Sequence, residues 1–453
     1  MRQTSLRRRS SLSLLSVLLA ALPCGQSTAA EGSAAKVAET DVGGVEAPEI
    51  PLDLTPKIPR ELAPEIARDL VVAGYLRALS GLNSEGSRAA CFQLAGSQAK
   101  YRLGNECEVY GELFVGKQLA SFADGSTLSA NVMFSLNHAT AYNAGDHGTD
   151  TRVAQAYAAA EKLSQLNGGA VWAGRRYYKR EDIHINDFFY WNPQGLGGGI
   201  EDVAIGGVKV SLAYFREDNQ DQPIKADRYD FQVRGLKANP HGELEFGLSV
   251  IPVSGHVATG GDSGWSLTVQ HRQSNLLGDG WNKFAVQYGV GPGTGLGSTG
   301  PLANTTADKR WRVVEGIYAQ LTPQLGGMLT GVYQKDESPT GDQSWISAGG
   351  RLTYGLTEHW KLQGELGHDR VKPSAGATRN LTKLTIAPTL AMARGFWSRP
   401  ELRFFYTYAR WNDAAALAAN SSTNTAVAST AANGIFAGGT QGSTIGLQFE
   451  GWW

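Results

Sequence analysis

The last ten residues of the chain, TIGLQFEGWW, alternate apolar and polar side chains with a period of two. One parity is apolar and comprises Ile445, Leu447, Phe449 and Trp453. The other parity is mostly polar and comprises Thr444, Gln448, Glu450 and Trp452. Because successive side chains of a β-strand point to opposite faces, this pattern predicts a strand with one apolar and one polar face. It also predicts that the two terminal tryptophans point in opposite directions.

The same alternation recurs upstream. It is clear in residues 110–120 (YGELFVGKQLA), 280–290 (GWNKFAVQYGV) and 396–411 (FWSRPELRFFYTYARW). Glycine, asparagine and aspartate residues separate these segments and favour turns between them. Many such segments of about ten residues predict an all-β fold, a large antiparallel barrel.

The alternation does not by itself say which face of the barrel meets water. In a soluble barrel the polar face lies outside, whereas in an outer-membrane barrel the apolar face meets lipid and the polar face lines the lumen. Downstream of the N-terminus there is no run of 18 apolar residues, so a spanning helix is not expected. The chain length of 453 residues, the export signal described next and the terminal aromatic strand favour a transmembrane β-barrel.

The N-terminus carries a targeting signal. A basic segment with Arg2 and 7–9 precedes an apolar run at 12–22, and small residues at 27–30 suit signal-peptidase cleavage. We therefore predict a signal peptide at 1–30. Residues 31–70 hold nine acidic residues, five prolines and no aromatic residue, which predicts a periplasmic arm or linker. The barrel is predicted at 71–453.

Removal of residues 1–30 lowers the formal charge from −1 to −5, which disfavours a nucleic-acid partner. Two cysteines remain, Cys91 and Cys107, and an even pair in an exported protein predicts a disulfide. A metal site built from two thiols is a much weaker alternative. The sequence predicts no cofactor.

Five aromatic residues fall on the polar parity of their segments. They are Tyr75, Tyr110, Trp281, Trp397 and Trp452. Residues of an aromatic girdle would share the lipid-facing parity instead. Flat rings in a lumen can bury the C–H face of a sugar, while charged side chains bind its hydroxyls. The charged candidates are Arg77, Arg102, Glu112, Arg180, Asp182 and Asp187. This combination predicts a sugar-permeable pore.

Several motifs resemble those of the maltoporin family, the carbohydrate-specific porins of bacterial outer membranes. They are GYLRALSG at 74–81, CFQLAGSQAKYRLGNECEVYGEL at 91–113, WAGRRYYKREDIHINDFFYW at 172–191, WNKFAVQY at 281–288, WSRPELRFFYTYARW at 397–411 and the closing FEGWW. Their order and approximate spacing agree along 71–453. Together they are specific, although each motif alone is weak.

The resemblance implies a homotrimer of eighteen-stranded barrels in the bacterial outer membrane, each narrowed by an inward-folded third loop. It implies passive diffusion of maltose and maltodextrins along an aromatic strip that matches the five residues above, with Tyr142 as the nearest match for a sixth ring from a neighbouring subunit. The resemblance also adds Arg152 to the charged side chains that bind sugar hydroxyls. It implies that Cys91 and Cys107 form a disulfide within the first loop. Phe189 stands where the family's constriction has a tyrosine.

The sequence leaves alternatives to a sugar-selective channel. A general diffusion porin would pass sugars and unrelated solutes of equal size alike. A secreted glycan-active enzyme would use Asp182 with Asp187, or Glu401, as a carboxylate pair. Many arginines near these acids, and no apolar pocket to raise a carboxyl pKa, disfavour the enzyme. His184 is expected to be a hydrogen-bonding loop residue, and the segments 291–310 and 412–443 are expected to be surface loops.

Overall fold

The computed structural model describes residues 69–140, 149–217, 226–252 and 261–453. The predicted signal peptide, 1–30, lies outside the described residues. So does the predicted arm, 31–70, apart from Asp69 and Leu70, and Leu70 begins the first strand. Within the described ranges, no helix combines the length and the apolar composition needed to cross a bilayer.

One antiparallel sheet of eighteen strands dominates the described residues. Its strands are β1 (Leu70–Asn83), β2 (Glu108–Ser121), β3 (Thr127–Ala139), β4 (Asp150–Leu163), β5 (Gly169–Tyr177), β8 (Gln194–Ile205), β9 (Val208–Glu217), β10 (Arg228–Asn239), β11 (Gly242–Ile251), β12 (Gly264–Leu276), β13 (Gly280–Val290), β14 (Lys309–Gln320), β15 (Leu325–Glu337), β16 (Gln343–Gly355), β17 (Trp360–Pro373), β18 (Arg379–Ala391), β19 (Glu401–Trp411) and β20 (Gln441–Trp452). A second, two-stranded sheet consists of β6 (Glu181–Ile183) and β7 (Phe188–Trp191). The helices α2 (Asp413–Ala419) and α3 (Thr425–Ala428) precede β20, and 3₁₀ turns span Ser164–Leu166, His184–Asn186 and Gly291–Gly295.

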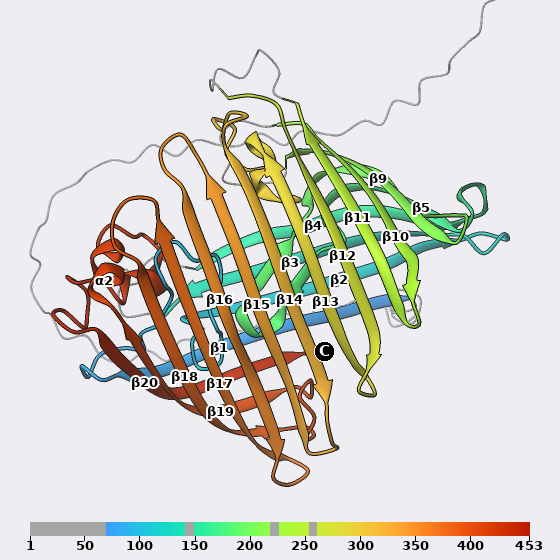
Figure 1. Cartoon of the computed structure of the whole chain (residues 1–453). Coiled ribbons are helices and arrows are strands. Elements are labelled where there is room, and N and C mark those ends of the chain that lie inside the picture. The colour runs from blue at the N-terminus through green and yellow to red at the C-terminus, as the bar shows by residue number, and fades with distance from the viewer. Residues whose placement is uncertain (1–68, 141–148, 218–225, 253–260) are drawn as a thin grey trace, which may run out of the picture. The chain divides into compact units, whose positions relative to one another are not determined.

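The large sheet closes into a barrel because β1 pairs with both β2 and β20 (Figure 1). The chain end takes part in this closure. The N–H of Trp453 donates to the carbonyl of Gly74, and the N–H of Gly74 donates to the carbonyl of Trp453, each at 3.1 Å. The predicted antiparallel barrel, with the eighteen strands that the resemblance implied, is confirmed.

The barrel is apolar outside and polar inside. Leu384, Leu402 and Phe404 are 45%, 46% and 51% exposed on the outer face. Arg403 and Gln448, which pair across β19 and β20, are buried on the inner face. This distribution is the reverse of a soluble protein and is typical of a barrel whose outer face meets lipid.

The two ends of the barrel differ in the length of their connections. At the end that carries Trp453, the connections run from two residues (206–207, 240–241) to nine (392–400). At the other end they reach 29 residues, in the segment 412–440. Short turns face the periplasm in barrels of this type, and long loops face outward. We call these the turn end and the loop end.

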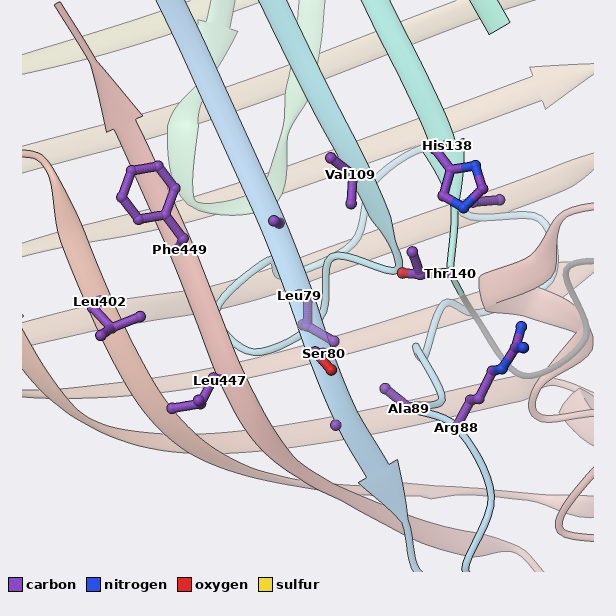
Figure 2. A pocket seen from close by; sticks show the side chains of 13 residues that line it. Leu79, Ser80, Arg88, Ala89, Val109, His138, Thr140, Leu402, Leu447 and Phe449 are labelled. Carbon is purple, nitrogen blue, oxygen red and sulfur yellow. The ribbon is translucent and has the colours of Figure 1, made fainter. Parts of the chain in front are cut away.

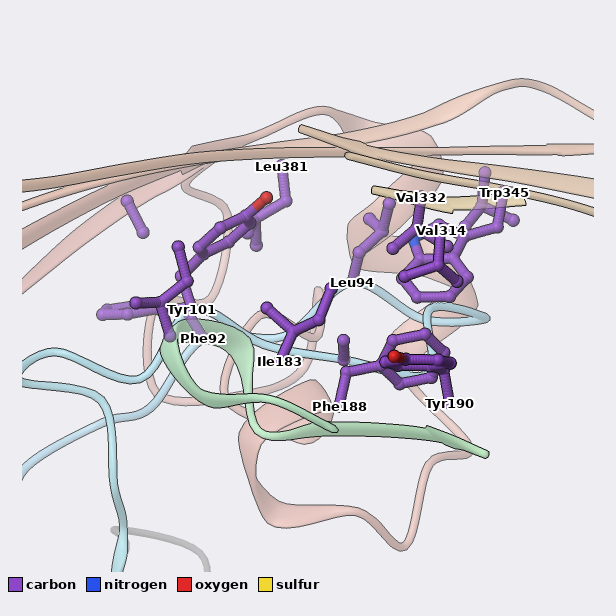
Figure 3. Close-up of a cluster of buried hydrophobic side chains, with 14 of the residues drawn as sticks. Phe92, Leu94, Tyr101, Ile183, Phe188, Tyr190, Val314, Val332, Trp345 and Leu381 are labelled. Carbon is purple, nitrogen blue, oxygen red and sulfur yellow. The ribbon is translucent and has the colours of Figure 1, made fainter. Parts of the chain in front are cut away.

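Two loops from the loop end fold into the barrel. They are the first loop, residues 84–107, and the inner loop, residues 178–193. Their apolar side chains lie together against the wall strands (Figure 3). Glycines in the wall strands allow the first loop to pack closely, because a Cβ at Gly349 or Gly367 would overlap the ring of Tyr101. Backbone groups of Leu103 are also bonded to the wall, where its N–H donates to Glu365 at 2.9 Å.

The segments 291–310 and 412–443, expected as surface loops, lie mostly at the loop end, where Leu417 is 66% exposed, but part of each is buried. Leu296 is fully buried, and the carbonyl of Gly297 accepts a hydrogen bond from the guanidinium of Arg228 at 2.7 Å. In the last loop, the Phe436 ring stacks on Phe92 of the first loop with 5.8 Å between centroids. Low sequence complexity concealed this burial, because alanine and glycine permit close packing without an apolar periodicity.

Candidate functional site

The inner loop crosses the lumen with two different faces. Ile183, Phe188 and Tyr190 are buried against the barrel wall. On the other side, Asp182 and His184 line a cavity of about 490 Å³ toward the turn end. Asp187 and Phe189 line a second cavity, which lies toward the loop end. The inner loop therefore lines a cavity on its turn-end side and another on its loop-end side.

Glu181 attaches the inner loop to the wall. Its carboxylate is 2.7 Å from Lys283 and 2.8 Å from Arg234, and it is also paired with Arg272. These three basic residues come from β13, β10 and β12 respectively. Glu181 was not among the predicted site residues. In the segment REDIHIND, Glu181 and Asp182 have opposite parity. This alternation could have indicated that Glu181 faces the wall.

The turn-end half of the lumen holds a chain of aromatic rings. Trp281 lies 6.1 Å from Tyr318, and Tyr318 lies 5.4 Å from Trp397, between ring centroids. The imidazole of His184 then lies 5.1 Å from Trp397 and 6.0 Å from Trp452. Tyr318 was not among the predicted site residues, although it directly opposes Trp281 in the β13–β14 register.

The chain of rings continues into β1 and β2. Trp452 is the direct cross-strand partner of Tyr75. The ring of Tyr75 lies 6.1 Å from that of Tyr110. We call Tyr75, Tyr110, Trp281, Tyr318, Trp397 and Trp452 the aromatic series. The rings of Trp281, Trp397 and Trp452 are thus connected through Tyr318 and His184, and the backbone register places the Tyr75–Tyr110 ring pair next to Trp452.

Trp397 reaches the lumen in a different way from that predicted. Strand parity placed it on a strand with Glu401, whereas the structure places it in the turn 392–400. Pro400 lacks the N–H that a ladder hydrogen bond requires, and β19 begins after it. Trp397 nevertheless lines the same cavity as Trp281 and Asp182. Its orientation comes from the turn and from contacts with Tyr318, not from the period of a strand.

The charged residues near β1 form a connected group of ion pairs. Arg77 lies 3.2 Å from Asp187 of the inner loop and is also paired with Glu108. Arg102 lies 3.1 Å from Glu450 and is paired with Glu106. A further part of the network joins Glu450 and Glu401 to Arg399 and Arg403. We call Arg77, Arg102, Glu106, Glu401, Glu450, Arg399 and Arg403 the ionic cluster.

Burial and charge compete at Glu106 in the first loop. Burial by itself would raise the pKa of this carboxyl. Arg102, Arg77 and Lys100 oppose that effect and hold the pKa of Glu106 well below its usual range. Glu106 was not among the predicted site residues, because it lies in a loop without a strand parity.

Arg180, Glu112 and Phe189 meet at the narrowed part of the lumen. The guanidinium carbon of Arg180 is 3.7 Å from the centroid of the Tyr177 ring and 4.5 Å from that of Phe189. Glu112 accepts a hydrogen bond from the hydroxyl of Tyr110. Phe189 is 38% exposed and offers a ring without a hydroxyl donor. An arginine held between two rings keeps a fixed position beside the aromatic series.

The pKa values of two inner-loop side chains, His184 and Asp182, are shifted from their ordinary values. Burial lowers the pKa of His184 well below 6.5, so its imidazole is neutral at physiological pH. Burial also raises the pKa of Asp182. The cavity beside Asp182 is also lined by Arg272 and Lys283, so it is not an isolated apolar pocket. His184 also contacts the Arg399 guanidinium, at 3.4 Å.

The remaining predicted residues occupy separate places. Arg152 is paired with Asp150 at 2.6 Å near the loop end of β4, where register places it opposite Ser135. Tyr142 lies outside the described residues. Cys91 and Cys107 form a disulfide that closes the first loop. Among the described residues, no group of three or more histidine, cysteine or acidic side chains is arranged to hold a metal ion.

Several solved porin structures are similar to the chain. Salmonella typhi OmpF in complex with daunomycin shares 12% identity, with a TM-score of 0.47, over 85% of this chain and 97% of that one. Pseudomonas aeruginosa OpdK with vanillate shares 10% identity, with a TM-score of 0.48, over 85% and 99%. An anion-selective porin from Comamonas acidovorans shares 10% identity, with a TM-score of 0.42, over 84% and 99%.

A sequence model of one protein family, described as LamB porin, matches residues 70–453. The match covers the whole barrel, from the first residue of β1 to the last residue of the chain. It agrees with the closed antiparallel barrel, with its polar lumen and with the inward-folded loops. The resemblance to the maltoporin family is thereby confirmed, and the chain belongs to the LamB porin family.

Proposed function

We propose that this channel carries maltose, maltodextrins or related oligosaccharides by facilitated diffusion along the aromatic series. As a LamB porin, the chain is a diffusion channel of the bacterial outer membrane. The proposal adds a substrate class and a path. The observation that carries it is the series of ring contacts from Trp281 to Trp452, which the cross-strand pairing of Trp452 with Tyr75 extends to the Tyr75–Tyr110 ring pair, with charged side chains beside them.

The physical argument concerns what a sugar gains along this path. Each ring can bury the C–H face of a pyranose, and charged side chains beside the rings provide donors and acceptors for its hydroxyls. Trp281 and Trp397 line a cavity together with Asp182 and Lys283. A series of weak sites permits entry without trapping the solute, which conduction requires. Arg77, Arg102, Glu112, Arg180, Asp182, Asp187 and Arg152 are the proposed polar contacts.

A current-block experiment tests the proposal. The mature protein is reconstituted in a planar bilayer, and maltotriose is titrated against the ion current. A saturable block is expected, because a bound sugar occupies the narrow lumen. Polyethylene glycol of similar size serves as the control and should lower the current without saturation. Equal behaviour of the two solutes would support the alternative, a general diffusion porin.

The enzyme alternative has a separate test. Its candidate acid Glu401 is paired with Lys361, Arg399 and Arg403, which suits a structural role. The LamB porin family is one of channels, which points to a non-enzymatic protein. Incubation of the purified protein with maltodextrin should release no shorter products. Hydrolysis that co-purifies with the folded barrel would revive the alternative.

We also propose that the channel assembles as a homotrimer through the outer face of β1–β5. This face is rich in small residues. Its outward alanines on β3, β4 and β5 are Ala130, Ala156, Ala158, Ala160 and Ala173. A hollow of about 570 Å³ lies beside them, over β1 and β20, near Ser80 and Leu447 (Figure 2). Small residues permit close approach of two protein walls within a membrane.

The trimer proposal is tested by a bulky substitution on this face. Ala158→Trp should shift the purified protein from trimer to monomer on a non-denaturing gel, because an indole would separate the two walls. The matched control is Leu384→Trp, on the lipid-facing side of β18. An unchanged trimer in the Ala158→Trp protein would contradict the assignment of this face. Tyr142 is the proposed contribution of the neighbouring subunit to the sugar path.

The N-terminal segments remain proposals as well. We propose that residues 1–30 are removed on export and that 31–70 form a periplasmic arm. N-terminal sequencing of the mature outer-membrane protein tests the first part. A mature chain that begins at Met1 would contradict it.

A further inference from the structure

A second cavity lies on the loop-end side of the inner loop, away from Trp281 and Trp397. Its volume is about 380 Å³, within the range of small-molecule sites. It is bounded by the first loop, the inner loop, the segment 291–308 and the beginning of β14. Two arginines of β14, Arg310 and Arg312, line it. The aromatic series and the proposed sugar path do not account for these two residues.

Arg312 is a buried cation whose hydrogen-bond partners are neutral. It is 3% exposed. Its Nε donates to Gln334 at 2.8 Å, its Nη2 to Gln98 at 2.6 Å, and its Nη1 to the carbonyl of Tyr190 at 3.1 Å and to Gln287 at 3.3 Å. Its guanidinium carbon also lies 4.8 Å from the centroid of the Phe188 ring. Over the described ranges, no carboxylate lies within ion-pair distance of Arg312. A buried charge without a counter-ion is costly, and an anionic ligand would remove that cost.

The neighbouring charges leave this corner of the cavity positive. Arg310 lies two residues from Arg312 on β14 and is paired with Asp336, and no ion pair joins Asp336 to Arg312 in the described part of the chain. Asp187 is the acidic group on another part of the cavity wall. Its carboxylate is already 3.2 Å from Arg77. The arginine corner is therefore the place where an anion would be favoured.

Other lining groups indicate a ligand larger than a simple anion. The side-chain oxygen of Asn192 is buried and has no hydrogen-bond partner, so it can accept a hydroxyl proton. The ring of Phe189 is 38% exposed at the same cavity and offers a flat apolar surface. An anionic group, a hydroxyl donor and an apolar C–H face occur together in an acidic monosaccharide.

We propose that this loop-end cavity is a binding site for a monosaccharide with one anionic group, a hexuronate or a sugar phosphate. The anionic group binds Arg312 and Arg310, a hydroxyl donates to Asn192, and the sugar ring lies on Phe189. The site lies on the loop-end side of the inner loop, and it shares Asp187 with the proposed path for neutral oligosaccharides. It would concentrate acidic sugars at the outer entrance of the channel.

The test uses the mature protein in planar bilayers at constant ionic strength. D-glucuronate and glucose 6-phosphate are the probes, glucose is the neutral control, and acetate is the anion without a ring. At least one probe should reduce the ion current with an apparent dissociation constant about tenfold below those of glucose and acetate. A response to one probe only identifies whether the site takes a carboxylate or a phosphate. Equal effects of probes and controls would overturn the proposal.

Two substitutions with opposite expected effects localise the site. Arg312→Gln should weaken binding of the effective probe about tenfold. Asp336→Asn should strengthen it, because Arg310 loses its carboxylate partner. Block by maltotriose should persist in both proteins, which shows that the barrel and the aromatic series are intact. Unchanged probe binding in both variants would refute the site, whatever the outcome for maltotriose.

Discussion

The aromatic series and the ionic cluster lie side by side in the lumen. They differ in how many of their side chains are available to contact a ligand. Most rings of the series are partly exposed and touch their neighbours at an angle. In the ionic cluster, Glu450 is shared by Arg102, Arg399 and Arg403 and is 2% exposed. The rings are available to a ligand, whereas most of the charges are already satisfied by one another.

This difference separates two roles, stabilisation of the barrel and binding of sugar, which could not be told apart from the sequence. Buried charges that neutralise one another fix the positions of β19, β20 and the first loop. Partly exposed rings keep an apolar face that a sugar can cover. We therefore expect loss of a cluster carboxylate to affect mainly the stability of the barrel. Loss of a ring should affect mainly sugar binding.

The largest expected effect is that of Glu450→Ala. The substitution leaves Arg102, Arg399 and Arg403 with one buried carboxylate fewer, and removal of one partner of a buried ion pair costs about 3–5 kcal/mol. Urea unfolding in detergent, followed by the gel mobility of the folded barrel, measures the free energy of unfolding. The control is Glu337→Ala, whose pair with Lys335 is exposed, and its unfolding midpoint should not move. Similar midpoints for both variants would show that the cluster does not stabilise the barrel.

A smaller effect is expected for Trp281→Ala and for Trp397→Ala. Each should weaken the block by maltotriose about two- to tenfold, because one stacking surface of roughly 0.5–1.5 kcal/mol is lost. Ion conductance without sugar should change much less. Trp311→Ala is the control, since Trp311 packs against Tyr333 outside the series. A parallel loss of sugar affinity and conductance would indicate structural damage instead.

The smallest effect is expected for Tyr318, which touches both Trp281 and Trp397 but is 7% exposed itself. We expect it to position the two indoles. Tyr318→Ala should weaken maltotriose block about twofold, and Tyr318→Phe should restore it, because the ring makes the contacts. Titration of the ion current with maltotriose measures both. Failure of phenylalanine to restore binding would assign the role to the hydroxyl group.

Much of the lumen could be predicted from strand parity. The period of two placed Tyr75, Tyr110, Trp281 and Trp452 on the polar face, and the register of the barrel agrees. The same rule would have included Tyr318, which follows the parity of Arg310 and Arg312 along β14. Parity works in these cases because each strand of a closed barrel has only an inner and an outer face.

Parity gave no information where the chain leaves the strands. Trp397 faces the lumen from a turn, and Glu106 is buried through the fold of the first loop. The ion pairs of Glu181 with Arg234, Arg272 and Lys283 join a loop to three wall strands. Local sequence patterns do not encode such long-range contacts.

The sequence by itself determined the barrel, its polar lumen and the rings on the inner face, because alternation assigns each strand residue to one of two sides. The tertiary structure decided how far each inward-facing side chain is available to a ligand. The first loop and the inner loop fold into the lumen, neutralise most of its charges and line two cavities. Those effects depend on which distant segments meet, and closure of the sheet through β1 and β20 is what brings them together.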